Sequence, residues 1–351
     1  MHRIAILEWG GAVGEVDAPT PEPVGEEVLV KVEVCGVCHS DVHIWDGFFD
    51  LGNGKRWEMA ARVSLPFSPG HEIVGRVAAL GPDARGVEIG RSYVVYPWIG
   101  CGECARCAGG DELLCDNPQS LGVRRDGGYA DHVIVPNARY LVRYDGLPRE
   151  LACTYACSGI TAYSALKKVP ALRPDDWLAV IGVGGVGLSA VQLARTVVGS
   201  RVVAADIDAA KRAHALTAGA EKAVDNGGEN AVKEMLRETG GGAAAAIDFV
   251  GSPATVKYAI DIVRRGGQVV VVGLFGGAIT LPTMTFPSKL VTVTGSYVGT
   301  LDDLKEVIAL AQAGKLAPIP VTPVPARKAG EALRDLKQGG KVVGRVVLVH
   351  D

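Results

Sequence analysis

The feature that most constrains the fold is a run of glycines between an apolar strand and a helical stretch. The run, GVGGVG, contains Gly182, Gly184, Gly185 and Gly187. It follows the continuously apolar Trp177–Ile181 and leads into Val186–Val198. The first glycine permits a tight turn, the next lets the backbone approach a phosphate, and the last allows close helix–strand packing. The pattern alone is weak, but this context predicts a dinucleotide-binding turn.

An acidic residue ends the next apolar strand. Asp206 follows Val202–Ala205, nineteen residues after Gly187. A carboxylate there accepts hydrogen bonds from the adenosine ribose hydroxyls and repels a 2′-phosphate, while the new helix presents free N–H groups to the pyrophosphate. We therefore expect NAD rather than NADP. The alternative is a glycine-rich connector with a helix-capping Asp.

Strands and helices alternate through the middle of the chain. Further strands are expected at Ala244–Phe249 and Gln268–Val272, with a helix over Pro253–Arg264. This alternation predicts a doubly wound parallel sheet covered on both faces. The first 155 residues instead carry short β-like runs broken by Gly and Pro, such as Glu27–Val34 and Ile73–Leu80. We expect a separate β-rich, barrel-like domain there, and hence an α/β protein of two domains.

Composition excludes several partners. The net charge is −3, and no basic stripe favours nucleic acid or an anionic membrane. No stretch of about 18 uninterrupted apolar residues predicts a membrane span. The start of the chain lacks the residue order of a signal peptide. We expect a cytoplasmic protein that binds neither nucleic acid nor membranes.

Four of the eight cysteines lie close together. They are Cys101, Cys104, Cys107 and Cys115. Four thiolates at this spacing can surround one tetrahedral Zn²⁺ and leave no open position, which is typical of a structural site. An iron–sulfur cluster is the rival, but the usual bacterial spacing that ends in Cys-Pro is absent.

A second set of metal-binding residue types is spread along the chain. It comprises Cys38-His39-Ser40-Asp41-Val-His43, Gly70-His71-Glu72 and Cys157. Two thiolates and one imidazole make a zinc site whose fourth position is open to water or substrate, where the metal polarises a bound oxygen. Taken singly, His71 fits a core histidine and Cys157 a small buried hydrophobe. Cys35 and Cys38 form a Cys-x-x-Cys pair, but no thioredoxin-like βαβ pattern surrounds them.

The whole chain resembles the zinc-containing medium-chain alcohol dehydrogenases, and most closely the tetrameric bacterial and archaeal members. The matching strings are GVCHSDVH, PGHEIVGRV, CGECARCAGGDELLC, GGYADHV, ACSGITAYSAL and VIGVGGVGLSAVQLA. The resemblance implies a GroES-like catalytic domain over residues 1–157 and 296–351, and a Rossmann domain over 158–295. It also implies a homotetramer or homodimer, for which the β-like run Val291–Tyr297 is a candidate pairing strand.

The same resemblance implies roles for the second set. Cys38, His71 and Cys157 would bind the catalytic zinc, an arrangement for which alcohol dehydrogenase is itself the standard example. Glu72 would be a transient ligand beside them. Ser40 would take the substrate proton and pass it through the nicotinamide ribose to His43. Asp41 would steady the ligands.

Four further matches are less specific. The resemblance implies that His39 and Arg345 would contact the coenzyme pyrophosphate, that Thr161 would pack against the nicotinamide, and that Trp98 would line the substrate pocket. The alternative for each is an ordinary surface or core residue. The segment Gly47–Ser68 differs from shorter members and reads as an enlarged loop and helix.

The resemblance, together with the glycine-rich turn and the two ligand sets, therefore implies an NAD-dependent alcohol dehydrogenase with two zinc ions per chain. It would oxidise primary or secondary alcohols, cyclic or aromatic ones included, to aldehydes or ketones. One alternative is a zinc polyol or sorbitol dehydrogenase, which shares this framework. Another is a non-catalytic dinucleotide-binding protein, against which the intact set of open-site ligands and relay residues argues.

Overall fold

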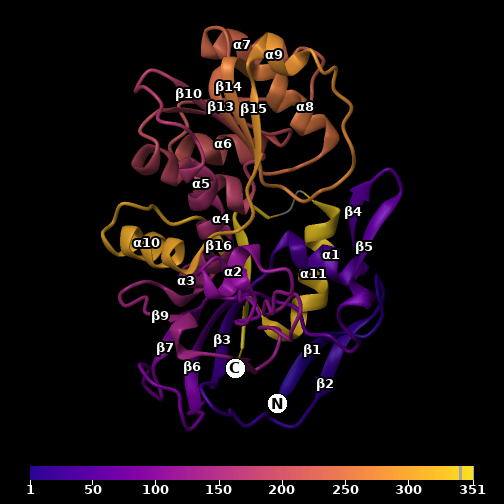
Figure 1. Ribbon diagram of the computed structural model, residues 1–351, viewed down its shortest axis with the longest axis vertical. Coiled ribbons are helices and arrows are strands. Elements are labelled where there is room, and N and C mark those ends of the chain that lie inside the picture. Colours follow the sequence, from indigo (N-terminus) through magenta and orange to yellow (C-terminus); the bar gives the residue numbers. More distant parts are fainter. Residues whose placement is uncertain (340–341, 351) are drawn as a thin grey trace.

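Two large sheets organise the chain in the computed structural model, which describes residues 1–339 and 342–350 (Figure 1). The first is a six-stranded sheet in which every neighbouring pair is parallel. Its order reverses between β10 and β13, so the loops after these two strands diverge and leave room for a ligand. In spatial order the strands are β12 (Lys222–Val224), β11 (Arg201–Ala205), β10 (Trp177–Ile181), β13 (Ala243–Asp248), β14 (Val263–Val271) and β15 (Thr292–Gly295).

The strands of this sheet are apolar because both of their faces are covered. Along β10, Leu178 and Val180 join one buried cluster, whereas Ala179 and Ile181 join another on the opposite face. The helices that pack against the sheet are α5 (Gly185–Val197), α6 (Ala209–Thr217), α7 (Ala231–Thr239) and α8 (Pro253–Ile262). The predicted doubly wound α/β sheet is confirmed.

One boundary within this sheet was predicted wrongly. The expected helix over Pro253–Arg264 ends at Ile262, and β14 begins at Val263 instead of Gln268. Val263 is already extended and pairs with Ala243, after which the register shifts. A bulged strand start of this kind, with glycines inside it, has no simple alternating pattern to reveal it.

The second sheet is built from both ends of the chain. Its strands are β16 (Val321–Pro325), β17 (Arg345–Val349), β3 (Val28–Gly36), β6 (Glu72–Leu80), β7 (Ser92–Val95) and β9 (Leu141–Val142), and β8 (His132–Val135) also pairs with β3. The antiparallel pairing of β17 with β3 brings the tail back to the first residues, and both termini lie in the lower part of Figure 1. This pairing supports our proposed division into 1–157 with 296–351 and 158–295.

The segment Gly47–Ser68 is a hairpin rather than a loop and helix. Strands β4 (Phe48–Gly52) and β5 (Lys55–Glu58) pair, and only a short 3₁₀ turn over Met59–Ala61 follows. Phe49 and Trp57 face each other across the hairpin, a pairing typical of strands. The prediction was wrong because neither strand alternates cleanly between apolar and polar residues.

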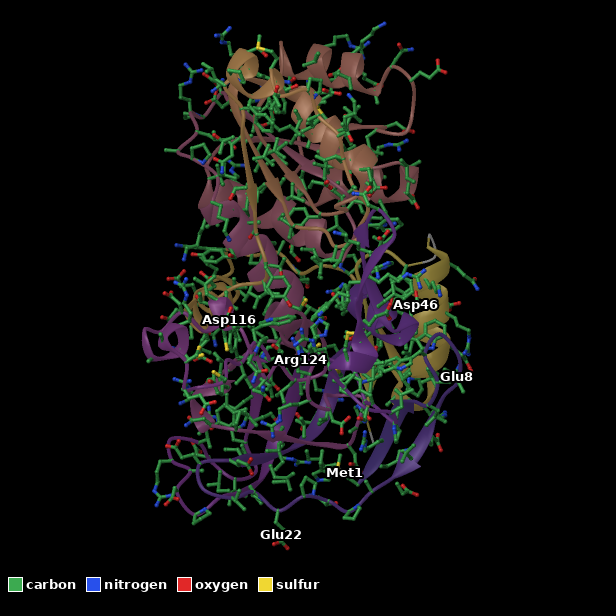
Figure 2. The ribbon with its side chains drawn as sticks, turned by 45° about the vertical axis from the view of Figure 1, so that its right-hand side comes forward. Met1, Glu8, Glu22, Asp46, Asp116 and Arg124 are labelled. Carbon is green, nitrogen blue, oxygen red and sulfur yellow. The ribbon has the colours of Figure 1, made fainter. Side chains whose placement is uncertain are left out.

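The remaining elements connect or cover the sheets. Strands β1 (His2–Ile6) and β2 (Val13–Asp17) form a second hairpin. The helices are α1 (His39–Asp46), α2 (Ala105–Ala108), α3 (Arg149–Thr154), α4 (Ile160–Lys167), α9 (Thr285–Lys289), α10 (Leu301–Gln312) and α11 (Ala329–Gln338). Along the molecule's long axis, Met1 lies toward one end and Arg124 near the middle (Figure 2). Among the described residues, no helix is both long and apolar enough to cross a bilayer.

Candidate active site and metal centres

Three distant parts of the chain bring four metal-binding side chains together. Cys38 immediately precedes α1, His71 and Glu72 stand at the start of β6, and Cys157 lies in a π-helical turn, Tyr155–Gly159, between α3 and α4. All four are buried, and their ligand atoms lie within 4.8 Å of one another. A π-helical turn is uncommon and often marks a functional site, but no pattern in the sequence indicated it.

The donor atoms fit a zinc ion. The sulfurs of Cys38 and Cys157 are 3.9 Å apart, close to the separation of about 3.8 Å that two thiolates take on one tetrahedral zinc. The imidazole of His71 is fully buried, and its Nε2 has no hydrogen-bond partner among the described residues. An unpaired buried nitrogen is costly unless something binds it, and a metal ion meets that need.

The buried carboxylate of Asp41 contacts the imidazole of His71. Asp41 Oδ1 lies 3.2 Å from His71 Nδ1, and Asp41 Oδ2 accepts a 2.9 Å hydrogen bond from the backbone N–H of Cys38. The hydroxyl of buried Tyr129 donates to the same Oδ2 at 3.3 Å. Asp41 thus orients two metal-binding residues from different segments, Cys38 and His71. This arrangement fits the ligand-orienting role predicted for Asp41. The sequence did not indicate that Tyr129 belongs to this site, although a buried tyrosine hydroxyl needs a hydrogen-bond partner.

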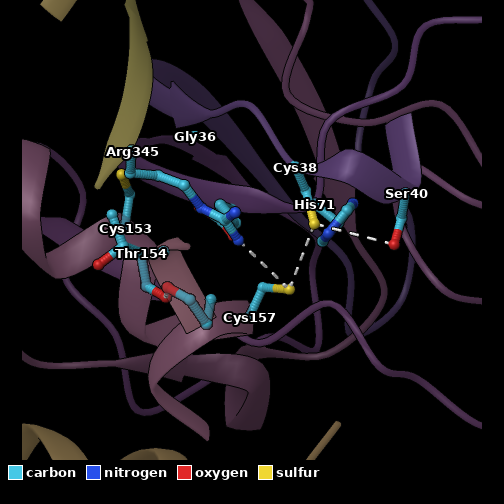
Figure 3. A network of polar contacts seen from close by, with 12 residues as sticks. Gly36, Cys38, Ser40, His71, Cys153, Thr154, Cys157 and Arg345 are labelled. Carbon is cyan, nitrogen blue, oxygen red and sulfur yellow. Dashed lines mark hydrogen bonds and ion pairs between the residues drawn. The ribbon is translucent and has the colours of Figure 1, made fainter. Parts of the chain in front are cut away.

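Burial and neighbouring charges shift the pKa values of the cluster's side chains in different directions. The pKa of Cys38 is lowered, because the Cys157 thiol hydrogen-bonds to its sulfur and the Arg345 guanidinium lies nearby. Burial raises the pKa of Glu72, although Arg345 opposes this. Arg345 Nε donates to Glu72 Oε2 at 3.2 Å, and its Nη2 lies 4.0 Å from the sulfur of Cys157 (Figure 3).

Arg345 also touches the glycine-rich turn. A Cβ atom added at Gly185 would lie 3.0 Å from the Gly344 carbonyl oxygen and 3.4 Å from Arg345 Nη1, so the segment that carries Arg345 packs directly against the turn. The guanidinium therefore lies between the metal-binding cluster and the predicted phosphate site. Its contact with the pyrophosphate stays a prediction, and the ion pair with Glu72 adds a partner that the sequence did not indicate.

The glycine-rich turn has the shape that a dinucleotide needs. Gly182 has a φ of +78°, and a Cβ at Gly187 would lie 2.0 Å from the carbonyl oxygen of Gly182. At Gly184, by contrast, an added Cβ would meet no protein atom within 4 Å, which leaves space for a phosphate. Asp206 Oδ2 accepts a 2.9 Å hydrogen bond from the Val183 N–H, which fixes its carboxylate beside the turn.

Thr161 supplies a further polar atom in this region. It lies in the first turn of α4, is buried, and has no hydrogen-bond partner for its Oγ1 among the described residues. Such a hydroxyl fits a position that a bound coenzyme completes. The residues at the turn, Asp206 and Thr161 together fit NAD, and their individual roles stay predictions.

The predicted relay residues share the first turns of α1. Ser40 Oγ lies 3.8 Å from the sulfur of Cys38, and His43 follows three residues later on the same side of the helix. The His43 ring is 5.2 Å from the ring of His39 and 5.1 Å from that of Phe49. Burial lowers the pKa of both histidines, which keeps them neutral and able to accept a proton near pH 7.

Aromatic rings adjoin the cluster on another side. The Trp98 ring is 5.1 Å from that of His71 and 5.7 Å from that of Tyr297, and Trp98 Nε1 donates to the carbonyl oxygen of Ala156. The sequence indicated Tyr297 only as the last residue of the candidate pairing strand Val291–Tyr297. It lies just beyond β15, the edge strand of the parallel sheet, whose role in subunit contact stays a prediction.

The four-cysteine cluster is separate and forms within fifteen consecutive residues. Sulfur atoms lie 3.9 Å apart in the pairs Cys101–Cys107 and Cys104–Cys115. Backbone N–H groups point at the sulfurs, with Cys101 N 3.3 Å from Cys115 Sγ and Cys104 N 3.4 Å from Cys101 Sγ. Hydrogen bonds from the backbone N–H groups of Glu103 and Cys104 lower the pKa of Cys101 to about 7. The cluster fits a closed tetrahedral zinc site.

Comparisons with known proteins cover both parts of the chain. Residues 25–146 match the family described as "Alcohol dehydrogenase GroES-like domain", and residues 185–313 match "Zinc-binding dehydrogenase". A relative from Sulfurisphaera tokodaii, named "NAD-dependent alcohol dehydrogenase", is 37% identical over 99% of this chain and 100% of its own length.

Two solved structures are similar over the whole chain. The alcohol dehydrogenase of Aeropyrum pernix has a TM-score of 0.89 at 31% identity, covering 99% of this chain and 100% of that one. The D-arabinose dehydrogenase of Sulfolobus solfataricus has a TM-score of 0.83 at 26% identity, covering 99% of each chain.

Proposed function

Because the chain belongs to the zinc-binding medium-chain alcohol dehydrogenase family, we propose that it oxidises an alcohol to the corresponding carbonyl compound with NAD⁺ as hydride acceptor, reversibly. The observation that carries this proposal is the open Cys38–His71–Cys157 cluster beside the glycine-rich turn. The named relatives support the same reaction class. The substrates proposed from the sequence are primary or secondary alcohols.

Zinc held by Cys38, His71 and Cys157 would polarise the substrate oxygen and acidify its hydroxyl proton. Ser40 accepts that proton, because its Oγ is beside Cys38 and is only partly buried. Ser40 releases its own hydroxyl proton toward the nicotinamide ribose as it does so, and neutral His43 would receive the proton from that ribose. Buried Trp98 excludes water from the reacting carbon on the side of His71, and the Tyr297 ring packs against Trp98. Asp41 fixes the imidazole, and Glu72 stays paired with Arg345.

An NADH-linked screen tests the proposed reaction. Primary, secondary, cyclic and aromatic alcohols are offered with NAD⁺, and the matching carbonyl compounds with NADH. We expect turnover in both directions with simple or aromatic alcohols. Polyols and sugars belong in the same screen, because the structural similarity extends to a D-arabinose dehydrogenase. Preference for them would favour the polyol alternative, and coenzyme binding without any turnover would favour the non-catalytic one.

Coenzyme choice should depend on Asp206. We expect Asp206→Ala to reduce the ratio of kcat/KM for NAD⁺ to that for NADP⁺ by about tenfold or more, because the ribose hydroxyls lose an acceptor and a 2′-phosphate is no longer repelled. Steady-state kinetics with both coenzymes measures the ratio. Glu221→Ala is the matched control, since it removes an exposed carboxylate beside β12 that pairs with Arg201. An equal loss for both coenzymes in Asp206→Ala would refute the assignment.

A further inference from the structure

Arg124 lies beside the active site in a turn that is fixed to a zinc-ligand segment. A Cβ at Gly122 would lie 2.3 Å from the carbonyl oxygen of Gly70, so the two backbones are in direct contact one residue before His71. The Gly128 N–H also donates to that oxygen at 2.8 Å. The turn itself is closed by the Arg124 N–H, which donates to the Ser120 carbonyl at 2.9 Å. The position of Arg124 relative to His71 is therefore set by packing.

The guanidinium faces the aromatic side of the site. Arg124 Cζ is 5.3 Å from the Trp57 ring centroid, on the hairpin whose Phe49 contacts His43. The charge of Arg124 lowers the pKa of Tyr297, whereas the charges of Cys157 and Cys38 raise it. Although Tyr297 is 51% exposed, surrounding protein raises its pKa to about 12. Tyr297 thus interacts electrostatically with Arg124, and its ring packs against Trp98, which contacts His71.

The charge of Arg124 is not neutralised by any acidic side chain in residues 1–339 and 342–350. Arg124 is half-buried, yet no Asp or Glu among the described residues forms an ion pair with it. Partial burial lowers the pKa of Arg124, and the charge of Arg62 lowers it further. Arg62 likewise has no acidic partner in the described part of the chain. A partly buried guanidinium without a counter-ion keeps its N–H donors free for an external acceptor.

We propose that Arg124 binds a carboxylate group of the substrate, so that this enzyme prefers hydroxy acids, and the matching oxo acids, to neutral alcohols of the same size. The inference builds on the proposed alcohol dehydrogenase activity and names its substrate class. A guanidinium offers two parallel N–H donors, the arrangement that a carboxylate accepts best. The Trp57, Trp98 and Tyr297 rings flank the carbon skeleton between carboxylate and carbinol. Arg62 adds positive charge at the same end.

Paired substrates test this assignment. The acids are para-hydroxymethylbenzoate and omega-hydroxyhexanoate, and each is compared with its own methyl ester, which keeps the carbinol and removes the charge. For the native enzyme we expect kcat/KM to be about tenfold or more higher for the acid than for the ester, mainly through KM. In Arg124→Gln this ratio should fall by about tenfold, and Arg124→Lys should retain part of it.

Arg125→Gln is the matched control. Arg125 is in the same turn, is also half-buried and has no ion-pair partner in the described structure, but its side chain has no ring contact with Trp57. Its ratio of acid to ester should equal that of the native enzyme. Esters oxidised as well as acids by the native enzyme, or an unchanged ratio in Arg124→Gln, would overturn the inference and leave the proposed reaction standing. No turnover of acids, esters or simple alcohols would overturn both.

Discussion

Ser40→Ala is expected to lower kcat by roughly 10²- to 10⁴-fold, the range in which a positioned proton acceptor contributes to catalysis. Ser40 lies in the first turn of α1 with its Oγ 3.8 Å from the sulfur of Cys38, and it is the one hydroxyl side chain of this described helix. The affinity for NADH should change little, because the glycine-rich turn and Asp206 are in another domain. Single-turnover kinetics and NADH fluorescence titration measure the two quantities.

Two accompanying variants make the Ser40 result specific. Ser40→Thr keeps the hydroxyl group and should keep a substantial part of the activity. His43→Gln keeps a polar side chain at the next relay position but cannot accept a proton. Its reduction in kcat should be smaller when an external buffer accepts the proton in place of His43. The zinc content of each variant is measured alongside, because Ser40 adjoins a ligand. Unchanged turnover in Ser40→Ala at full zinc content would refute the proposed relay.

The sequence predicted the coenzyme half of the molecule best, because its signals are local. The glycines, the buried β10 and Asp206 all lie within about thirty residues, and each has one physical reason for its place. The ends of helices and strands were predicted less accurately where a helical and a strand pattern fit the same residues. Val263 was assigned to a helix although it begins β14, since apolar residues near the end of a helix look the same as those that start a buried strand.

The open metal cluster could not be derived from spacing. Cys38, His71 and Cys157 come together only because β3, β6 and the π-helical turn pack against one another, and the sequence alone gives no measure of that packing. Family resemblance, not local pattern, supplied these three residues. Neither approach indicated that Arg345 pairs with Glu72, that Tyr129 bonds to Asp41, or that Arg124 has no counter-ion among the described residues, because each depends on tertiary contacts between distant segments.

The four-cysteine cluster was the opposite case, since its ligands are close in sequence and its effect should be mainly on stability. Cys104→Ser is expected to reduce the zinc content from about two ions per chain to about one and to lower Tm by about 10 °C or more. The segment that carries the four cysteines has little helical structure to stabilise it, because α2 spans only Ala105–Ala108 and buries no residue. Catalysis at low temperature should be retained, because the open cluster is built from other segments.

Metal analysis and calorimetry decide this prediction, with Cys153→Ala as the control. Cys153 is a buried free cysteine that belongs to neither cluster, and its thiol only donates to the Glu150 carbonyl at 3.3 Å. Its variant should bind about two zinc ions, and its Tm should fall by less than that of Cys104→Ser. If Cys104→Ser kept both ions and the native Tm, the closed site would not be a structural zinc site. Iron in the native protein would overturn the choice of metal, because four thiolates accept either ion and only the spacing argues for zinc.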